Sequence, residues 1–456
     1  MTTIQETSTV SGIPLEQLEA LLALPYKTDI NWIAPVALKD VTFARGSQEV
    51  ISKIRATLAI HLTRRRAKDR DKINLALRLI LSNLVYSVFG RTLLAIPNNH
   101  KTFLTGGLLK RLFLSKNATR DVLEALIKEG YIVKIKGSYF KKEINRYKPT
   151  DKLKILLIPL IYCVTEVYDA VNYKQYVKIN PESNKERTKR IQKERKNLRT
   201  TTTIGSNLPV LTTLFSSSVH TIGASSLPDD HSDIVGIKKI NDFLQSVSYA
   251  LKAPVSLTYT KDAFHGGRLY VAIQNLPDRR VKVRINTLIN GHPVCEIDLS
   301  ASHLRIAAAF NKVQLPEDPY TEIAVRADVT RDQVKFLLTR AFGAKDRRIN
   351  CWENNVLILS TTQRAKIEEF TQELYPDVFS ALYKGMGSPY QSIEGAVLMK
   401  TMLSLIDLGI PSLPIHDAIM VQQEHLEEAR TAFENAWMEV LDVDFKPYTK
   451  VDMPNG

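Results

Sequence analysis

Residues 294–300, Val-Cys-Glu-Ile-Asp-Leu-Ser, and residues 413–421, Leu-Pro-Ile-His-Asp-Ala-Ile-Met-Val, each place an aspartate at the end of a short apolar run. Apolar residues continue after Asp298 and after Asp417, a pattern that predicts carboxylates held at the rim of a buried sheet. An ionised carboxylate is costly to remove from water unless it is paired or binds a cation. Two of them at neighbouring strand ends can share a pair of divalent cations. Ordinary strand-end polar residues are the alternative interpretation.

The composition points to a globular protein with an anionic partner. The 456 residues carry a formal net charge of +14, with 44% hydrophobic and 24% charged residues. This charge favours nucleic acid before membrane, because contacts to phosphates release counterions; a merely basic surface is the alternative. Three cysteines without paired spacing disfavour a disulfide framework or a zinc site. The polar start does not have the pattern of a signal peptide, and the longest apolar run, 155–164, is too short to cross a bilayer, so we expect a cytoplasmic protein.

A capped helix is the clearest local signal in the first half of the chain. It follows a stretch from Ile73 to Phe89 in which apolar residues recur at helical spacing. Residues 115–130 predict the helix itself, with Ser115 or Asn117 as its N-cap and Gly130 at its end.

A hairpin follows this helix. Residues 131–136 alternate like a strand, a Gly-Ser turn comes next, and residues 139–147 return. Helix, capped helix and basic hairpin over 76–155 resemble a winged-helix domain, whose capped helix would enter a DNA major groove. A winged helix used for protein contacts is the alternative.

The segments on either side are less informative. Residues 1–75 read as helical and end in a basic stretch at 64–70, which fits either a phosphate contact or a solvated helix face. Residues 180–235 contain a charged helical stretch followed by Ser, Thr and Pro residues typical of a linker.

Five segments of the C-terminal half combine polar and basic residues in a fixed order. They are Gly-Gly-Arg-Leu-Tyr at 266–270 with Gln-Asn-Leu-Pro at 274–277, Asp-Leu-Ser-Ala-Ser-His-Leu-Arg at 298–305, Arg331 and Lys335 with Phe342-Gly343, Ser-Pro-Tyr-Gln at 388–391, and Ile-His-Asp-Ala-Ile at 415–419. Arg331 and Lys335 are four residues apart, so both point from one helical face; a solvated face is the alternative. Each segment alone is unspecific, but five in this order are hard to obtain by chance.

This order resembles the polymerase domain of the family A (DNA polymerase I-like) enzymes and of their relatives, the single-subunit phage RNA polymerases. The family pattern is a Gly-Arg-Leu element with a downstream Gln-Asn-Leu-Pro, then Asp-x-Ser ending in Leu-Arg, Arg-x-x-x-Lys with an aromatic-Gly, a Pro-x-Gln helix, and His-Asp. The resemblance covers roughly residues 255–456. It implies a mixed α/β fold with a right-hand architecture, in which helical fingers adjoin an antiparallel palm sheet.

The resemblance also implies roles for the matching residues. Asp298 and Asp417 would hold two Mg²⁺ ions, with the backbone carbonyl of Leu299 completing one shell. Arg331 and Lys335 would bind the triphosphate, and Lys335 would protonate the departing pyrophosphate.

The other matching residues would contact the substrates. Phe342 and His303 would lie beside the incoming nucleotide; packing is the alternative role for His303. The implied contacts to the primer–template come from Arg268, Gln274, Asn275, Gln391 and, at the primer terminus, His416. A plain helix-start position is the alternative for Gln391.

The chain departs from the family pattern in several places. His303 replaces a glutamate that helps the DNA polymerases to exclude the ribose 2′-hydroxyl, so the preferred sugar is open. Phe342 falls one residue closer to Lys335 than the pattern asks, and Ala418 stands where the DNA polymerases often have glutamate. The segment 331–391 is short, which indicates trimmed fingers. No Asp-x-Glu exonuclease pattern is apparent in the N-terminal half, so proofreading is not expected.

The sequence therefore predicts a template-directed nucleotidyltransferase, and first a DNA polymerase that extends a DNA primer with nucleoside triphosphates and Mg²⁺. A plasmid, phage or mobile element is the expected setting, with a replication protein as a possible partner. Two alternatives stay open: an RNA polymerase or primase of the same fold, and a non-catalytic DNA-binding initiator or regulator. The predicted divisions are a helical region at 1–75, a winged helix at 76–155, a helical, thumb-like segment with a linker at 156–240, and palm with fingers at 241–456.

Overall fold

The computed structural model describes residues 36–37, 41–43, 47–62, 67–96, 114–135, 145–180, 227–260, 262–277, 281–353 and 356–454. Several predicted features lie outside them. These are residues 1–35 of the N-terminal region, part of the basic stretch at 64–70, the tip of the predicted hairpin at 136–144, and most of the linker, 181–226.

The N-terminal body packs helices against a small sheet. Its helices are α3 (Gln48–Leu58), α4 (Ala67–Gly90), α7 (Lys116–Lys128) and α8 (Asp151–Leu157), and its four-stranded sheet has the order β1 (Val36–Ala37), β3 (Leu94–Ala95), β5 (Arg146–Pro149), β4 (Ile132–Ile135). The capped helix is confirmed, because the Ser115 side chain accepts from the Ala118 backbone N–H at the start of α7. Gly130 follows the helix with a φ of 68°, a left-handed conformation that suits glycine. The use of this body as a DNA-binding winged helix stays a prediction.

Helix α4 is the longest in this body and confirms the helical stretch predicted at Ile73–Phe89. By length and composition alone it would also pass as a membrane span. Within the protein, 72% of its most apolar stretch is buried, and it packs against α7, α8 and β2 (Val41–Phe43). This burial is what the core helix of a globular body requires.

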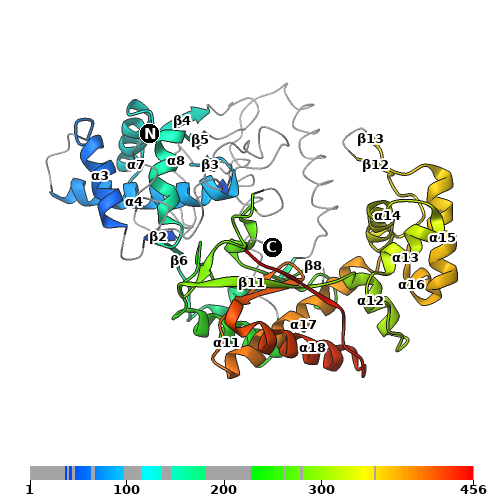
Figure 1. Cartoon of the computed structure of the whole chain (residues 1–456). Coiled ribbons are helices and arrows are strands. Elements are labelled where there is room, and N and C mark those ends of the chain that lie inside the picture. The colour runs from blue at the N-terminus through cyan, green and yellow to red at the C-terminus, as the bar shows by residue number, and fades with distance from the viewer. Residues whose placement is uncertain are drawn as a thin grey trace, which may run out of the picture.

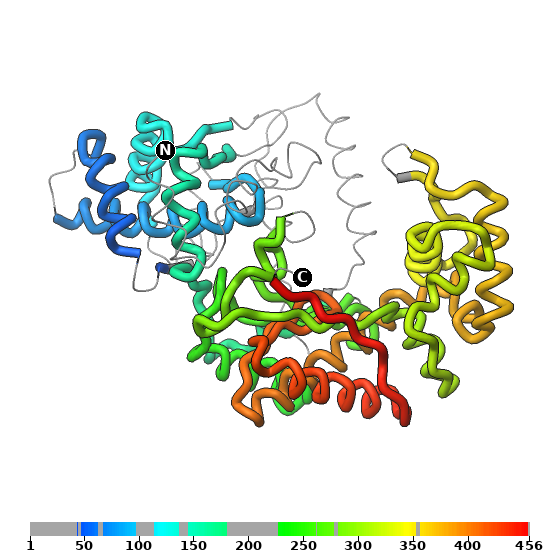
Figure 2. Tube along the Cα trace, in the orientation of Figure 1, coloured from blue at the N-terminus to red at the C-terminus, as the bar shows by residue number. Residues whose placement is uncertain are grey.

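An antiparallel sheet of five strands forms the centre of the C-terminal half. The order is β10 (Leu288–Ile289), β11 (His292–Leu299), β15 (Ala418–Gln422), β14 (Ser412–Ile415), and β16 (Thr449–Asp452) pairs with the far end of β11. Figure 2 shows the C-terminal strand, in red, running beside the green strand β11. The mixed α/β class and the antiparallel sheet agree with the sequence prediction.

A second sheet joins distant parts of the chain. Strand β7 (Val177–Asn180) pairs in parallel with β8 (Ser256–Thr260), which pairs with β9 (Arg268–Tyr270). The segment 156–240 was expected to be helical, but its described residues include β7 and β6 (Val164–Glu166) besides α11 (Ser232–Leu244). The difference arises because β6 and β7 each find a partner strand far away in sequence.

One group of helices covers one face of the main sheet, and another group lies to one side of it. Helix α17 (Gly387–Asp407) packs against α11, α18 (Leu426–Leu441), β9 and β14. In Figure 1 the α13–α16 helices lie at one end of the molecule, the N-terminal helices at the other, and the main sheet between them. The helices at that end are α12 (Ser302–Ala309), α13 (Pro319–Ala327), α14 (Arg331–Gly343), α15 (Thr361–Leu374) and α16 (Pro376–Ala381), with a hairpin of β12 (Trp352–Glu353) and β13 (Val356–Leu357).

One buried arginine fastens the end of β11 to the segment before α13. Arg305 on α12 is 4% exposed and donates hydrogen bonds to the backbone carbonyls of Ser300, Leu315, Pro316 and Glu317. Burial lowers the pKa of Arg305 to about 10, which leaves it charged at neutral pH.

Replacing this arginine should destabilise the C-terminal half. Arg305→Lys keeps the charge but cannot reach four carbonyls with one ammonium group, so buried acceptors lose their donors at about 1–3 kcal/mol each. We expect a clear fall in Tm by differential scanning fluorimetry. Arg348→Lys, at a side chain that is 90% exposed, serves as the control and should leave Tm unchanged. Equal Tm values for both variants would contradict the assignment of Arg305 as a structural tie.

Candidate active site

The pairing of two strands brings the two predicted aspartates together. Asp298 near the end of β11 lies opposite Ala418, the first residue of β15. Asp417 precedes Ala418 in the tight turn between β14 and β15, where His416 adopts a left-handed φ of 57°. Asp298 is exposed and Asp417 is half-buried. The sheet thus presents two carboxylates side by side at an accessible edge.

Burial and nearby negative charge disfavour the ionised form of both carboxylates. The pKa of Asp298 is raised to about 7, first by burial and then by the charge of Asp417, while the Lys335 ammonium opposes the shift. The pKa of Asp417 is also raised, first by burial and then by the charge of Glu394. Asp298 keeps solvent-exposed surface, but protein packs around its carboxylate closely enough for burial to dominate. A cation bound between the two groups would relieve this repulsion.

The donor set fits Mg²⁺ better than a closed metal site. Mg²⁺ typically binds one or two protein carboxylates and takes its other oxygens from water and substrate phosphates. Over the described ranges, no group of three or more His, Cys, Asp or Glu side chains is arranged to hold a metal ion. Leu299, whose carbonyl was the third expected ligand, is the last residue of β11 and has a buried side chain.

The predicted triphosphate-binding residues begin helix α14, but the structure treats them differently. Lys335 is exposed, and its charge acts on Asp298. Arg331 Nε donates to Asp318 Oδ2 at 2.6 Å, and its guanidinium lies 5.4 Å from the centre of the Tyr320 ring. Arg331 therefore holds the start of α13 against α14 through Nε, and its Nη1 and Nη2 groups carry further donors for a phosphate.

Three aromatic rings form a closed cluster beside the site. Phe342 lies edge-on to His303 and Tyr390, with ring centroids 5.7 and 5.6 Å away, and His303 lies 5.7 Å from Tyr390. Phe342 has 0% exposure. The role of Phe342 beside an incoming base stays a prediction, and it would require this cluster to open. His303 is a packing residue on one side and keeps partial exposure on the other.

The predicted primer–template residues are distributed over β9, the short helix η3, α17 and the turn between β14 and β15. Asn275 and His416 are exposed, and Arg268 and Gln391 are half-buried. Gln274, in the short helix η3 (Ala272–Asn275), is 6% exposed, so its expected contact with nucleic acid would require this segment to move.

Sequence reasoning missed Glu394, on α17 three residues after Gln391. Its side chain is 5% exposed, and its Oε1 accepts a hydrogen bond from Ser302 Oγ and lies 3.3 Å from His303 Nε2. Its Oε2 lies 3.5 Å from Arg268 Nη2. A glutamate inside an otherwise apolar helical stretch was the available signal, since such a carboxylate is costly to bury without partners.

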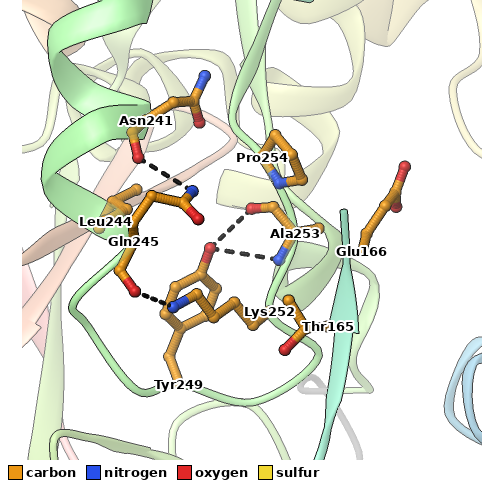
Figure 3. A pocket seen from close by; sticks show the side chains of 9 residues that line it. All are labelled: Thr165, Glu166, Asn241, Leu244, Gln245, Tyr249, Lys252, Ala253 and Pro254. Carbon is orange, nitrogen blue, oxygen red and sulfur yellow. Dashed lines mark hydrogen bonds between the residues drawn. The ribbon is translucent and has the colours of Figure 1, made fainter. Parts of the chain in front are cut away.

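A small pocket lies away from the carboxylates. Figure 3 shows it between β6, the end of α11 and the turn that follows. Tyr249 Oη donates to the Ala253 carbonyl at 2.6 Å, and Lys252 Nζ donates to the Gln245 carbonyl at 2.6 Å. These bonds tie the walls of the pocket to one another.

Comparisons with known proteins add little to this geometry. No protein-family model matches the sequence, and no curated protein matches it. Among solved structures, the polymerase domain of Pol1 from M. smegmatis, in complex with DNA primer-template and dNTP, is similar at 14% identity and a TM-score of 0.30. The match covers 90% of this chain and 66% of that chain. At this TM-score we draw no argument from the likeness.

Proposed function

We propose that the chain is a template-directed nucleotidyltransferase, and first a DNA-directed DNA polymerase that extends a primer 3′ end. The observation that carries the proposal is the register of β11 and β15, which places Asp417 beside Asp298. Burial and then nearby negative charge raise the pKa of both carboxyl groups. A pair of this kind suits a reaction in which divalent cations meet phosphate oxygens.

The residues of the site divide the work. Mg²⁺, when bound, would stabilise the attacking and leaving oxygens of an in-line transfer to a primer 3′-hydroxyl. Asp298, Asp417 and the Leu299 carbonyl would hold the ions. Lys335 would bind the triphosphate and give a proton to the departing pyrophosphate, with Arg331 as a second phosphate contact.

The remaining assignments rest on the sequence resemblance and on charge. Arg268, Asn275, Gln391 and His416 would contact the primer–template, and the N-terminal body would recruit DNA as a winged helix. A cytoplasmic setting on a plasmid, phage or mobile element is part of the same proposal. The net charge of +14 supports a nucleic-acid partner in general.

Primer extension tests the proposal directly. A labelled primer on a DNA template is incubated with Mg²⁺ and either dNTPs or rNTPs, with wild type beside Asp417→Ala. We expect extension with dNTPs that is lost in the variant. Extension with rNTPs alone would support the RNA polymerase or primase alternative. His303 and Ala418, which depart from the DNA polymerase pattern, are the residues that favour this alternative. No product with either, at enzyme equal to template, would overturn a stand-alone polymerase.

Thermal shifts separate an enzyme from a scaffold. If the carboxylate pair binds Mg²⁺, the ion should raise the Tm of the wild type and not that of Asp417→Ala, because a ligand stabilises only the folded state that binds it. Equal shifts in both proteins would favour a DNA-binding initiator or regulator without catalysis.

A further inference from the structure

Glu394 is the point where three segments of the candidate site meet. It lies on α17, Arg268 lies on β9, and Ser302 and His303 begin α12. Ser302 and His303 both approach Oε1, whereas Arg268 approaches Oε2. One carboxylate thus connects the helix that follows Asp298 with the strand that carries the predicted DNA contact.

A close backbone contact holds the helix of Glu394 against the strand of Arg268. Helix α17 presses against the backbone of the Gly266-Gly267 turn, where the Gly266 N–H donates to the Ser388 carbonyl at 2.9 Å. A Cβ on Gly395 would overlap the Gly267 carbonyl oxygen, and a Cβ on Gly267 would lie 3.0 Å from Ser392 Cα. The contact is therefore backbone to backbone, and it brings Arg268 next to Glu394.

The charges at this point explain why Glu394 is ionised despite its burial. Burial raises its pKa, but the hydrogen bonds from His303 and Ser302 and the charges of His303 and Arg268 outweigh burial and lower the pKa overall. A buried carboxylate survives in a protein when it is paired and hydrogen-bonded in this way. Glu394 Oε2 and Arg268 Nε are also buried without a hydrogen-bond partner of their own within the described part of the chain, so the Arg268 approach is electrostatic.

We propose that Glu394 is a positioning residue, which holds Arg268 and His303 in fixed places around the carboxylate pair so that they can engage the primer–template and the nucleotide. The proposal rests on the proposed polymerase function. Glu394 does not touch substrate; it acts through its partners, and its removal leaves Arg268 and His303 without the negative charge that they face.

A double-mutant cycle on DNA binding and on extension tests this role. Glu394→Gln keeps the shape and the hydrogen bond from Ser302, and Arg268→Gln removes the facing charge. Primer–template affinity is measured by fluorescence anisotropy without nucleotide, and KM and kcat are measured by extension. If Glu394 acts through Arg268, each single variant loses about 10- to 100-fold in affinity or kcat/KM, and the double variant loses no more than the worse single one.

Controls keep the outcomes separate. Glu368→Gln, which breaks a largely buried ion pair between Glu368 and Arg364 on α15, should lower Tm without affecting affinity or kcat/KM. Additive losses in the cycle, or a Glu394→Gln variant that changes only Tm, would overturn the positioning role while wild-type extension still stands. An inactive wild type would overturn the polymerase proposal instead, and the anisotropy cycle would still decide whether Glu394 and Arg268 are coupled.

Discussion

Asp298→Asn is expected to lose primer extension by about 10³-fold or more while raising the Tm of the metal-free protein at pH 8. Activity falls because asparagine binds a divalent cation far more weakly than a carboxylate does. Asp298 also acts together with Asp417, so losing one of the two removes most of the activity of the pair. Stability rises because the ionised Asp298 is both partly buried and close to Asp417. Loss of function and gain of stability in one variant are the signature of a carboxylate kept for catalysis.

The sign of the pH dependence follows from the raised pKa. The carboxyl titrates near its model value of 3.8 when unfolded and at about 7 when folded, so between these values the folded protein holds a proton that the unfolded chain has released. Asp298 therefore makes the metal-free protein less stable as pH rises from about 4 to about 7. The advantage of Asp298→Asn should be small at pH 4 and full at pH 8.

The size of this effect is limited by solvent. A shift of this extent would correspond to about 4 kcal/mol for a fully buried group, but Asp298 is exposed on one side, and screening reduces the expectation to about 1 kcal/mol. Tm values across this pH range, in chelator, provide the measurement. Asp230→Asn, at an exposed position, is the control and should show no trend. A Tm for Asp298→Asn that lies below wild type at every pH would contradict the repulsion between the aspartates.

Local signals in the sequence predicted local structure well. The cap at Ser115 and the glycine at 130 defined α7, because N-caps and left-handed glycines act within one helical turn. The tight turn at His416–Asp417 followed from an apolar run on each side, and it placed Asp417 at a strand end as expected. The pairing of β11 with β15 was also within reach, since both runs pointed to one buried sheet.

Contacts between distant segments were not predictable in the same way. Gln274 fits the Gln-Asn-Leu-Pro pattern and Phe342 lies one residue away from the expected aromatic position, yet tertiary packing buries both side chains. The role of Glu394 on α17 depends on Arg268 on strand β9 and on His303 on helix α12. The pattern of residues within α17 does not reveal these partners. Strand β7 was missed because its partner β8 lies beyond a long intervening segment.

Gly395→Ala is expected to be among the most damaging substitutions in the C-terminal half. Its Cβ would overlap the Gly267 carbonyl oxygen and lie 2.9 Å from the Gly267 carbonyl carbon. Backbone cannot move aside as a flexible side chain can, so α17 or the Gly266-Gly267 turn must shift. We expect a loss of about 3 kcal/mol in stability, at the upper end of overpacking effects. The same shift should carry Arg268 away from Glu394 and reduce extension.

Gly90→Ala provides the comparison. Gly90 is also a helical glycine, the last residue of α4, and a Cβ there would meet only Thr92 Oγ1 at 3.5 Å. That variant should keep the wild-type Tm or exceed it slightly, because alanine favours a helix over glycine. Melting followed by circular dichroism, together with primer extension, gives both readouts for each protein. If Gly395→Ala melts with the wild type and extends primers normally, the close approach of α17 to the Gly-Gly turn is wrong, and with it the geometry that places Arg268 beside Glu394. If Gly395→Ala has a lower Tm than the wild type but Gly90→Ala does not, the loss comes from the backbone contact and not from replacing any helical glycine. That contact then explains why the Gly-Gly-Arg segment occurs together with the Glu-Gly pair of α17 in this chain.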